Sequence, residues 1–364
     1  MNAYQGRLCR LREALGDLAR AVLITDLPNV RYLSGFTGSY LVREPVALVI
    51  TAESATLVTD ARFALQVREQ APDYSYHIVP RMLEGIAAVV SELGVLSLAF
   101  EEEALSFLQH RQLGERLPGV TLIGTEGLAA GLRMLKEPAE VAAIGAAAEL
   151  TDAAYAHLCR LVRPGITERQ LALEAEFFMR RQGAEGVAFE PIVAAGPRSA
   201  LPHAVPSPRP LQPGDLVIMD LGARLAGYCA DLTRTVAVGR AGEREREIYR
   251  VCHQAQAAGL AALRPGAWCR EVDEAAREVI TAAGYGEQFN HGLGHAVGME
   301  PHEPPRLART EARAVAPGMV LTVEPGIYLP ELGGVRIEDL VEVTAEGTRV
   351  LSHASNPAEL PVLG

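Results

Sequence analysis

The chain has 364 residues, enough for two domains that each bury a substantial core. Its 34 lysines and arginines against 45 aspartates and glutamates leave a net charge of −11, so we expect neither nucleic acid nor an anionic membrane as a partner. No apolar run approaches the roughly 18 residues of a transmembrane helix. The first residues lack the apolar stretch of a signal peptide, and the five cysteines show no CxxC spacing, which together predict a cytoplasmic protein with reduced thiols.

Lysine occurs once, at Lys136 in RMLKEP, where we expect a polar helix entrance. A P-loop requires a lysine after its glycines, and a pyridoxal enzyme requires one for its Schiff base. The sequence also contains neither a GxSxG nucleophile elbow nor an HExxH zinc helix. Kinases, ATPases, α/β-hydrolases and zincins are therefore not expected.

Residues 1–128 alternate helical and strand-like patterns, which predict an α/β domain with a mixed or parallel sheet. The segment NVRYLSGFTGS (29–39) is expected to form a glycine-punctuated loop. Strands are predicted at 21–25, 47–51, 55–58, 77–80 and 96–100, and helices at 6–20, 81–93 and 104–113.

The remainder, 129–364, has helices followed by strands that look antiparallel. Pro138 suits the first turn of an alanine-rich helix that extends to about residue 162. Arg-Pro-Gly occurs at 163–165 and again at 264–266, and each copy precedes an amphipathic helix and a glycine at the same offset of 101 residues. Either this match is a coincidence among common residues, or the domain contains two related halves with a site at their seam.

Four acids interrupt apolar, strand-like runs in this region. Two runs, 216–221 and 229–238, are predicted to form a hairpin and contain one aspartate each. A third run, 319–323, leads directly into a glutamate, and the strand predicted over 334–341 contains another. Because an unpaired buried carboxylate costs several kcal/mol, we expect cations between these acids. The four acids are Asp220, Asp231, Glu324 and Glu338.

Histidines form a second group of candidate ligands. The segment 291–307 contains His291, His295 and His302 beside glycines that allow close backbone approach, and His203 lies in a separate loop. Taken singly, an ordinary core or surface position remains the alternative for each. Four carboxylates and one imidazole suit two divalent ions. Two such ions could hold a bridging water and lower its pKa, which predicts metal-assisted hydrolysis with an amide as the natural substrate.

The ordered segments DLGARLAGYCADLTRT, HGLGHAVGMEPHEPP, TVEPGIYLP and VRIEDLVEV resemble the motif set of the pita-bread metallopeptidases. That family includes Xaa-Pro dipeptidases (prolidases), Xaa-Pro aminopeptidases, methionine aminopeptidases and metal-free creatinases. NVRYLSGFTGS is similar to the family's creatinase-like N-terminal domain. The resemblance implies an α/β creatinase-like domain over 1–128 and an α+β pita-bread catalytic domain with a pseudo-twofold internal repeat over 129–364.

The resemblance implies a ligand set for two divalent ions, manganese, cobalt or zinc. Asp220 and Asp231 match the first two ligands, with Asp231 bridging the ions, and His295 matches the imidazole ligand. Glu324 would bind a metal and serve as proton shuttle beside a metal-bridging hydroxide. Glu338 would bridge the two ions.

The resemblance also implies roles outside the ligand set. His203 and His302 would orient the scissile carbonyl and stabilise its oxyanion, a sensible role for donors beside a polarised carbonyl. His291 would line the proline side of the pocket, and Arg336 would support Glu338 or the substrate terminus. A family tyrosine near the second ligand is matched by Tyr228 and is expected to contact substrate.

The sequence departs from the family pattern at Ala296, where glycine is common, and at Pro301, where valine is usual. Both departures put the strictness for proline in question rather than the chemistry. The motif YCADLTRT resembles the proline-specific branch, and ExHEPP is more similar to prolidases than to aminopeptidases. Xaa-Pro dipeptidase is therefore the preferred prediction, Xaa-Pro aminopeptidase on longer peptides is the alternative, and a non-catalytic pita-bread binding module is the alternative from a different class.

Family resemblance further implies a homodimer that acts on short proline-containing peptides, with the N-terminal domain limiting peptide length. The segment Tyr32–Glu44 is the predicted gate. An ordinary surface loop of the N-terminal domain is the alternative for this segment.

Overall fold

The structure is a computed structural model that describes residues 3–39 and 46–364. The chain divides into two compact units, Met1–Arg133 and Met134–Gly364. The boundary expected from the sequence, between 128 and 129, lies at the first turn of helix α6 (Leu128–Arg133) in the N-terminal unit.

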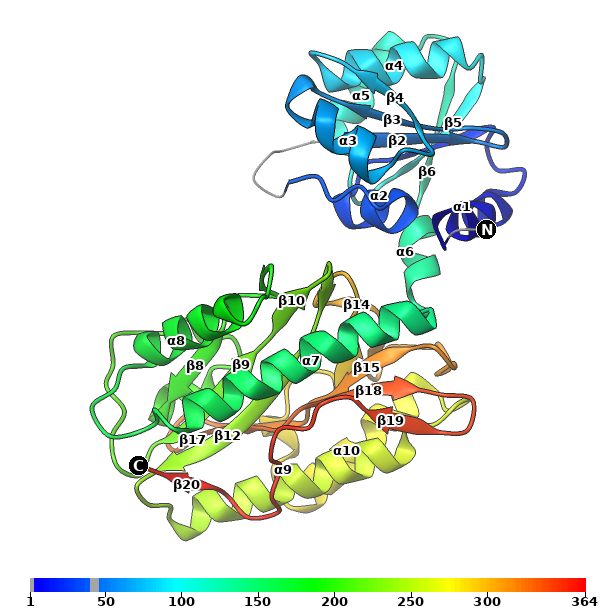
Figure 1. Cartoon of the computed structure of the whole chain (residues 1–364). Helices are drawn as coiled ribbons and strands as arrows, with labels where there is room; N and C mark the ends of the chain where they lie inside the picture. Colours follow the sequence, from blue (N-terminus) through cyan, green and yellow to red (C-terminus); the bar gives the residue numbers. More distant parts are fainter. Residues whose placement is uncertain (1–2, 40–45) are drawn as a thin grey trace. The chain divides into compact units, whose positions relative to one another are not determined.

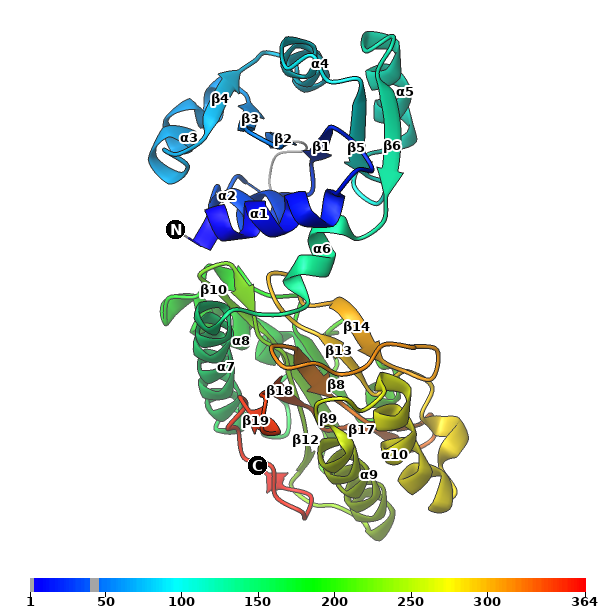
Figure 2. The ribbon, with the colours of Figure 1, turned by 90° about the vertical axis from the view of Figure 1, so that its right-hand side faces the viewer.

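The N-terminal unit contains a six-stranded sheet that confirms the predicted α/β architecture. Strand β2 pairs antiparallel with both β1 and β3. Strands β4, β5 and β6 join the sheet through parallel pairs with β3, β1 and β5, respectively. The strands, in sheet order, are β4 (Ser75–Ile78), β3 (Ala55–Thr59), β2 (Val46–Thr51), β1 (Ala21–Ile24), β5 (Ser97–Glu101) and β6 (Thr121–Thr125). Figure 2 shows α1 (Ala3–Leu15) and α2 (Leu27–Ser34) on one face and α4 (Met82–Glu92) on the other. The remaining helices of this unit are α3 (Ala64–Gln70) and α5 (Phe107–Arg116).

Helix α2 corrects the first part of the loop predicted over 29–39, because residues 29–34 are helical, whereas residues 35–39 lie outside helices and strands as predicted. The Asp26 side chain accepts a hydrogen bond from the Asn29 backbone N–H at 3.4 Å, Pro28 occupies the first turn, and Gly35 with φ 78° ends the helix. Gly35 is therefore a helix cap. Tyr32, the first residue of the predicted gate, is completely buried in this helix, and residues 40–44 of that gate lie outside the described residues.

The C-terminal unit is built from two similar halves, each a pair of helices packed on a sheet (Figure 1). In the first half, α7 (Pro138–Cys159) and α8 (Glu168–Arg181) cover strands in the order β20 (Val362–Leu363), β12 (Leu232–Val238), β9 (Leu216–Leu221) and β8 (Ile192–Ala195). In the second, α9 (Glu243–Ala262) and α10 (Cys269–Ala282) cover β14 (Glu303–Leu307), β13 (Gly294–Ala296), β15 (Val320–Val323), β18 (Asp339–Val343) and β19 (Thr348–Val350). Shorter elements complete the unit: β7 (Gly186–Val187), η2 (Gly196–Ala200), β10 (Ala223–Leu225), β11 (Tyr228–Cys229), η3 (Gly286–Gln288), β16 (Gly326–Leu329) and β17 (Gly333–Arg336).

The internal repeat predicted from the two Arg-Pro-Gly segments is confirmed by matching backbone geometry. Gly165 N–H donates to the Leu211 carbonyl at 2.9 Å, and Gly266 N–H donates to the Val315 carbonyl at 2.8 Å. The two glycines have φ of 91° and 84°, a region in which side chains other than glycine are strained. Both halves therefore enter their second helix through the same turn.

Lys136 corrects another expectation. It was expected at a polar helix entrance, but it is buried just before α7, and its Nζ lies 3.1 Å from Glu303 Oε2. The partner comes from a distant part of the sequence, so local composition could not reveal the burial.

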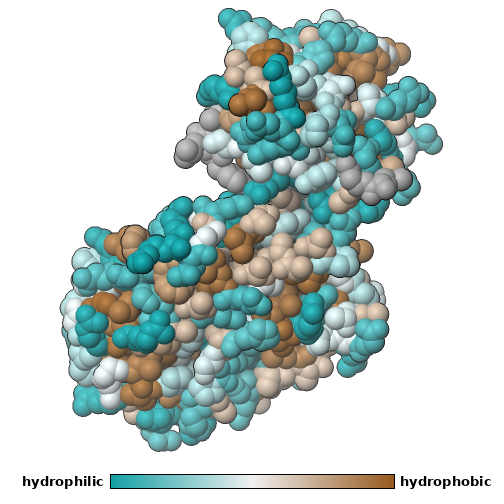
Figure 3. All heavy atoms as spheres, viewed as in Figure 1, coloured by the Kyte–Doolittle hydropathy of each residue, from teal (hydrophilic) through white to brown (hydrophobic). Residues whose placement is uncertain are grey.

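No helix within 3–39 and 46–364 combines the length and the hydropathy that crossing a membrane requires. On the face drawn in Figure 3, apolar patches alternate with hydrophilic ones rather than forming a continuous band.

Candidate metal centre and active site

A cavity of about 750 Å³ lies in the C-terminal unit and collects nearly all the residues that the sequence assigned to a site. The predicted residues that line it are Asp220, Asp231, His203, His291, His295, His302, Glu324, Arg336 and Glu338. The exception is Tyr228, whose hydroxyl donates to Glu140 Oε1 on α7 at 2.9 Å. The structure therefore does not bring Tyr228 into the cavity.

The four acids that line this cavity lie near the ends of strands or at breaks between strands. Asp220 is the penultimate residue of β9, and Glu324 follows the last residue of β15. Asp231 lies between β11 and β12, and Glu338 lies between β17 and β18, so the continuous strands predicted through these two residues are each interrupted. Each half of the unit thus contributes one acid at the end of a strand and one at a strand break.

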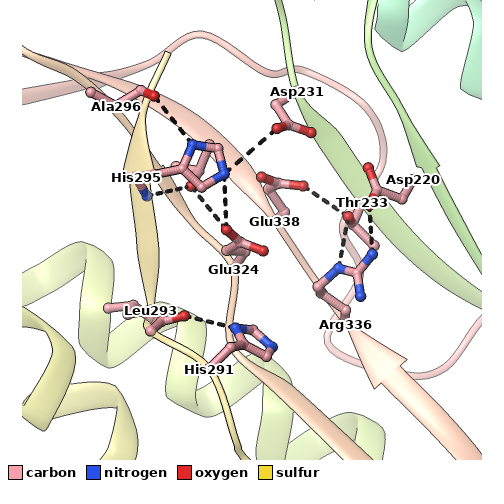
Figure 4. A network of polar contacts seen from close by, with 12 residues as sticks. Asp220, Asp231, Thr233, His291, Leu293, His295, Ala296, Glu324, Arg336 and Glu338 are labelled. Atoms are coloured by element: carbon pink, nitrogen blue, oxygen red, sulfur yellow. Dashed lines mark hydrogen bonds and ion pairs between the residues drawn. The ribbon is translucent and has the colours of Figure 1, made fainter. Parts of the chain in front are cut away.

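Three potential ligands converge closely. One ligand atom from each of Asp231, His295 and Glu338 lies within 4.8 Å of the other two (Figure 4). His295 Nε2 is 3.8 Å from Asp231 Oδ2 and 3.2 Å from Glu324 Oε1. The Thr233 hydroxyl donates to Glu338 Oε2 at 2.8 Å, which holds this carboxylate from the opposite half. The imidazole is therefore surrounded by acids on the side that Nε2 faces.

Among the described residues, Arg336 and His295 balance the charges of these acids only in part. Burial raises the pKa of both Asp231 and Glu338 well above the usual range, and the nearby carboxylates raise these pKa values further. Burial also raises the pKa of Asp220 against an opposing guanidinium. Glu324 differs: burial would raise its pKa, but the hydrogen bond and the charge of His295 hold that pKa at about 2. The arrangement favours the entry of positive charge.

Unpaired oxygens show where that charge fits. Asp220 Oδ1 and Glu338 Oε1 are buried and have no hydrogen-bond partner within the part of the chain that the structure describes. Buried polar atoms without a partner cost free energy, and a bound cation removes that cost. Carboxylate oxygens with one imidazole are the donor set of hard and borderline divalent ions. The residues that would hold such ions are Asp220, Asp231, His295, Glu324 and Glu338.

Arg336 supplies one positive charge to the cluster. Its Nη2 donates to Asp220 Oδ2 at 2.5 Å, and its Nε donates to the Thr233 hydroxyl at 3.1 Å. Its Nη1 donates to the Tyr328 hydroxyl at 3.0 Å. The direct ion pair is therefore with Asp220, and the link from Arg336 to Glu338 passes through Thr233.

Three further histidines line the cavity beside the acids. His291 Nε2 lies 2.9 Å from the Tyr328 hydroxyl, and burial lowers the pKa of His291. The ring of His302 lies 4.3 Å from that of His295, measured between centroids. Burial, followed by the charge of His295, lowers the pKa of His302 to about 4, so this imidazole is neutral at neutral pH and keeps one N–H to donate. His203 lies on the exposed loop after η2.

Among the residues lining the cavity that sequence reasoning missed are Arg306, Phe189 and Ile192. Arg306 lies on β14 directly opposite His295 in the strand register. Arg306 alternates with Pro305 and Leu307, which are buried. Because alternate strand residues face the same side, this alternation was an available signal that Arg306 faces the opposite side from these two residues. Phe189 and Ile192 lie at or just before β8, and nothing in their local sequence linked them to a site formed by distant segments.

Both units match known protein families. Residues 142–345 match Metallopeptidase family M24, and residues 7–135 match the Creatinase/Prolidase N-terminal domain.

The chain is also similar to individual proteins along nearly its whole length. An Xaa-Pro dipeptidase of Pyrococcus horikoshii is 36% identical over 337 residues, which are 91% of this chain and 92% of that protein. The solved structure of an Xaa-Pro dipeptidase from Bacillus anthracis is 39% identical with a TM-score of 0.94, covering 99% of this chain and 100% of the other. That of an X-Pro aminopeptidase from Thermotoga maritima is 33% identical with a TM-score of 0.86, covering 95% and 98%.

Proposed function

The chain belongs to metallopeptidase family M24, and from this premise we propose that it is an Xaa-Pro dipeptidase that uses two divalent metal ions. The observation that supports the metal site is the buried convergence of Asp231, His295 and Glu338 within 4.8 Å beside carboxylate oxygens that lack partners. The support for the substrate is the likeness to proteins named Xaa-Pro dipeptidase.

The proposed ligands act as one group. Asp220, Asp231, His295, Glu324 and Glu338 would hold the ions. When bound, divalent ions lower the pKa of a water and polarise a carbonyl, which is the chemistry that amide hydrolysis requires. Arg336 orients Asp220 through their 2.5 Å contact, and its positive charge opposes the rise in the pKa of Asp220 that burial causes.

Glu324 is the proposed proton carrier. Its Oε1 lies 3.2 Å from His295 Nε2 and accepts a hydrogen bond from the Thr322 hydroxyl at 3.3 Å. Because Oε1 has these two partners, we assign proton transfer to the other oxygen, Oε2. This carboxylate is ionised at neutral pH, which is the state that can accept a proton from the attacking water. It would pass that proton to the leaving nitrogen of proline, because this nitrogen carries no hydrogen in the peptide bond and must be protonated to leave.

His302 and His203 are the proposed donors to the scissile carbonyl. A neutral His302 donates an N–H to the oxygen on which negative charge develops, and donors of this kind stabilise the transition state more than the ground state. His203 lines the same cavity and would hold the carbonyl in position.

The two ends of a dipeptide need different recognition. Arg306 lines the cavity at an exposed position, and a guanidinium binds a carboxylate through two parallel hydrogen bonds, so we assign the C-terminal carboxylate of the substrate to Arg306. His291, held by Tyr328, would line the proline side. Phe189 and Ile192 supply apolar surface for the side chain of the first residue.

We further propose manganese, cobalt or zinc as the metal, a homodimer as the assembly, and the cytoplasm as the location. The oxygen-rich donor set with one imidazole accepts all three metals. The five cysteines are free, and Cys229, Cys252 and Cys269 are buried, which suits a reducing compartment.

Xaa-Pro aminopeptidase is the second candidate function. The likeness to the Thermotoga maritima X-Pro aminopeptidase supports it, at a lower TM-score than the likeness to the Bacillus anthracis dipeptidase. A non-catalytic binding module is disfavoured, because such modules lose ligands or the outer histidines, and here all of these residues line one cavity.

Ala-Pro, Ala-Pro-Ala and Met-Ala-Ser, assayed side by side with manganese present, test the proposal. We expect Ala-Pro to be hydrolysed with the highest kcat/KM, because only a dipeptide places its carboxylate next to the proline ring. Faster cleavage of Ala-Pro-Ala would favour the aminopeptidase. Cleavage of neither proline peptide would contradict both functions.

A further inference from the structure

The single lysine of the chain forms a buried ion pair near the site. Lys136 Nζ lies 3.1 Å from Glu303 Oε2, and the two side chains are only 1% and 3% exposed. The Lys136 backbone N–H also donates to the Gly318 carbonyl at 2.7 Å, which fixes this residue between α7 and the turn before β15. Neither Lys136 nor Glu303 is among the residues that line the cavity, so this pair does not itself touch the reacting groups.

Glu303 organises the loop between β13 and β14. Its Oε1 accepts hydrogen bonds from the backbone N–H groups of Met299 at 3.0 Å and Glu300 at 3.3 Å. A Cβ added at Gly298 would lie 2.4 Å from Glu303 Oε2, so the carboxylate packs directly against this part of the backbone. One carboxylate thus connects three consecutive residues of the loop 297–302 to the start of β14.

That loop carries His302, which immediately precedes Glu303 in the chain. The ring of His302 lies in the cavity, 4.3 Å from the ring of His295. In the strand register, Glu303 pairs with Ala296 and Arg306 pairs with His295, and a β-bulge lies between these two pairs. A displacement of the Glu303 carboxylate would therefore disturb the backbone of residues 298–300 and, through the same short loop, the position of His302.

We propose that the Lys136–Glu303 pair is a positioning device for His302. Lys136 neutralises the buried carboxylate, and the neutralised carboxylate can then hold the loop through its backbone hydrogen bonds. A buried ion pair adds little net stability compared with an apolar pair of the same shape, so stability alone does not account for it. The role assigned to His302 rests on the proposed function, whereas the positioning of its ring does not.

Because the chain has one lysine, labelling with ¹⁵N-lysine produces a single side-chain ammonium signal. We expect this signal to be visible at neutral pH on the full chain, because burial and the ion pair slow the exchange of its protons with water. Glu303→Gln removes the partner charge and should shift or broaden the signal. A signal that behaves like that of an exposed lysine, or one that Glu303→Gln leaves unchanged, would overturn the proposal.

The histidine ring signals test positioning without any activity measurement. The signal of His302 is assigned by its loss in His302→Ala. Lys136→Met should shift this signal, because the Glu303 carboxylate loses its ion pair with Lys136 and changes its position against the loop. The matched control is Arg209→Met, which breaks the Arg209–Asp215 ion pair of 2.6 Å in the other half of the unit and should leave the His302 signal unchanged. An unchanged His302 signal in Lys136→Met would contradict positioning.

Glu303→Gln combined with Lys136→Met removes both charges but keeps an oxygen that accepts from Met299 and Glu300. This double variant should return the His302 signal toward its wild-type position, and a signal that stays displaced would count against the proposal. Should Lys136→Met not fold, Lys136→Arg replaces it, since Arg keeps the charge but places it differently. It is expected to shift the same signal.

A double-mutant cycle on turnover separates positioning from a general structural role. Lys136→Met should lower kcat for Ala-Pro about tenfold with KM changed less than about twofold, since small misplacements of a catalytic group have effects of this order. In a His302→Ala background the same change should lower kcat by less than about twofold, because the group it positions is already gone. Equal effects in both backgrounds would overturn the proposal. A wild-type chain inactive on Ala-Pro would contradict the proposed function, and the ring signals would then decide the positioning claim alone.

Discussion

Two buried groups of charge in the C-terminal unit lie only a few residues apart and differ in how their charges are balanced. In the first, Arg234 Nη2 donates to Asp339 Oδ1 at 2.7 Å, and both side chains are buried. Arg234 also donates to the carbonyls of Ser355 and Ala354, and Asp339 Oδ2 accepts from Gln256 at 2.9 Å. This group satisfies its own charge.

The second group is the acid cluster around His295, in which Asp220 Oδ1 and Glu338 Oε1 lack partners among residues 3–39 and 46–364. Glu338 and Asp339 are consecutive, yet the first belongs to the unbalanced cluster and the second to the balanced one. Burial of acids is therefore not by itself a sign of a site. The sign is a cluster of several buried acids in which carboxylate oxygens have no donor among the described residues.

The largest expected effect comes from Asp231→Asn, which breaks the unbalanced cluster. Asparagine removes a charge that we assign to both metal ions, so turnover of Ala-Pro should fall below detection and the metal content of the purified protein should drop. Elemental analysis and the Ala-Pro assay measure the two effects. The matched control is Asp339→Asn in the balanced group, which should keep its metal while losing stability. Normal activity in Asp231→Asn would remove it from the ligand set.

Arg234→Met tests the balanced group. It leaves the Asp339 carboxylate buried with its main cation gone, and such a loss destabilises proteins by about 3–5 kcal/mol. Urea unfolding should show this decrease in the free energy of unfolding, while the folded fraction keeps its metal. If the metal content falls by more than the unfolded fraction of the protein, the two groups are not independent.

His302→Ala is expected to have a smaller effect, confined to catalysis. The metal should stay bound, and the loss of one donor to the developing oxyanion should cost about 2–4 kcal/mol of transition-state stabilisation. The ratio of kcat/KM between wild type and variant measures this energy. An unchanged kcat would exclude His302 from the mechanism.

The smallest expected effect is a pH dependence of stability in the metal-free chain. The pKa values of Asp231 and Glu338 are raised on folding, so their protonation stabilises the folded state fully below about pH 4, the range of unfolded carboxyls, and this stability is lost as pH rises through the folded pKa values. Glu324 has the opposite effect. Because its pKa is lowered on folding, its contribution to stability is present above about pH 4.5 and is lost as the pH falls further.

After chelator treatment, the Tm of the wild-type chain should therefore fall as the pH is raised from about 5 towards neutrality. The fall in Tm over this range should be larger for the wild type than for Asp231→Asn. Added manganese should flatten this dependence, because cations replace the missing protons. Identical slopes with and without metal would show that the acids do not bind it.

Local patterns were enough to predict much of the fold and of the cavity. The apolar run 216–221 predicted β9, and the acids were found because they interrupt such runs. The prediction failed where a partner is distant or where one residue type has two uses. Gly35 caps α2, so the loop begins there rather than at residue 29, and Lys136 forms a buried ion pair with Glu303, which lies 167 positions away. Arg306 was missed because its relation to His295 depends on the register of two strands.

The most direct measurement is an anomalous-scattering map at the manganese edge, from crystals of the full chain grown with manganese. We predict two peaks in the cavity, both in contact with Asp231 and Glu338, and one of them within coordination distance of His295. No peak in the cavity, or peaks only at exposed acids elsewhere, would contradict the claim that the unbalanced cluster is a metal centre.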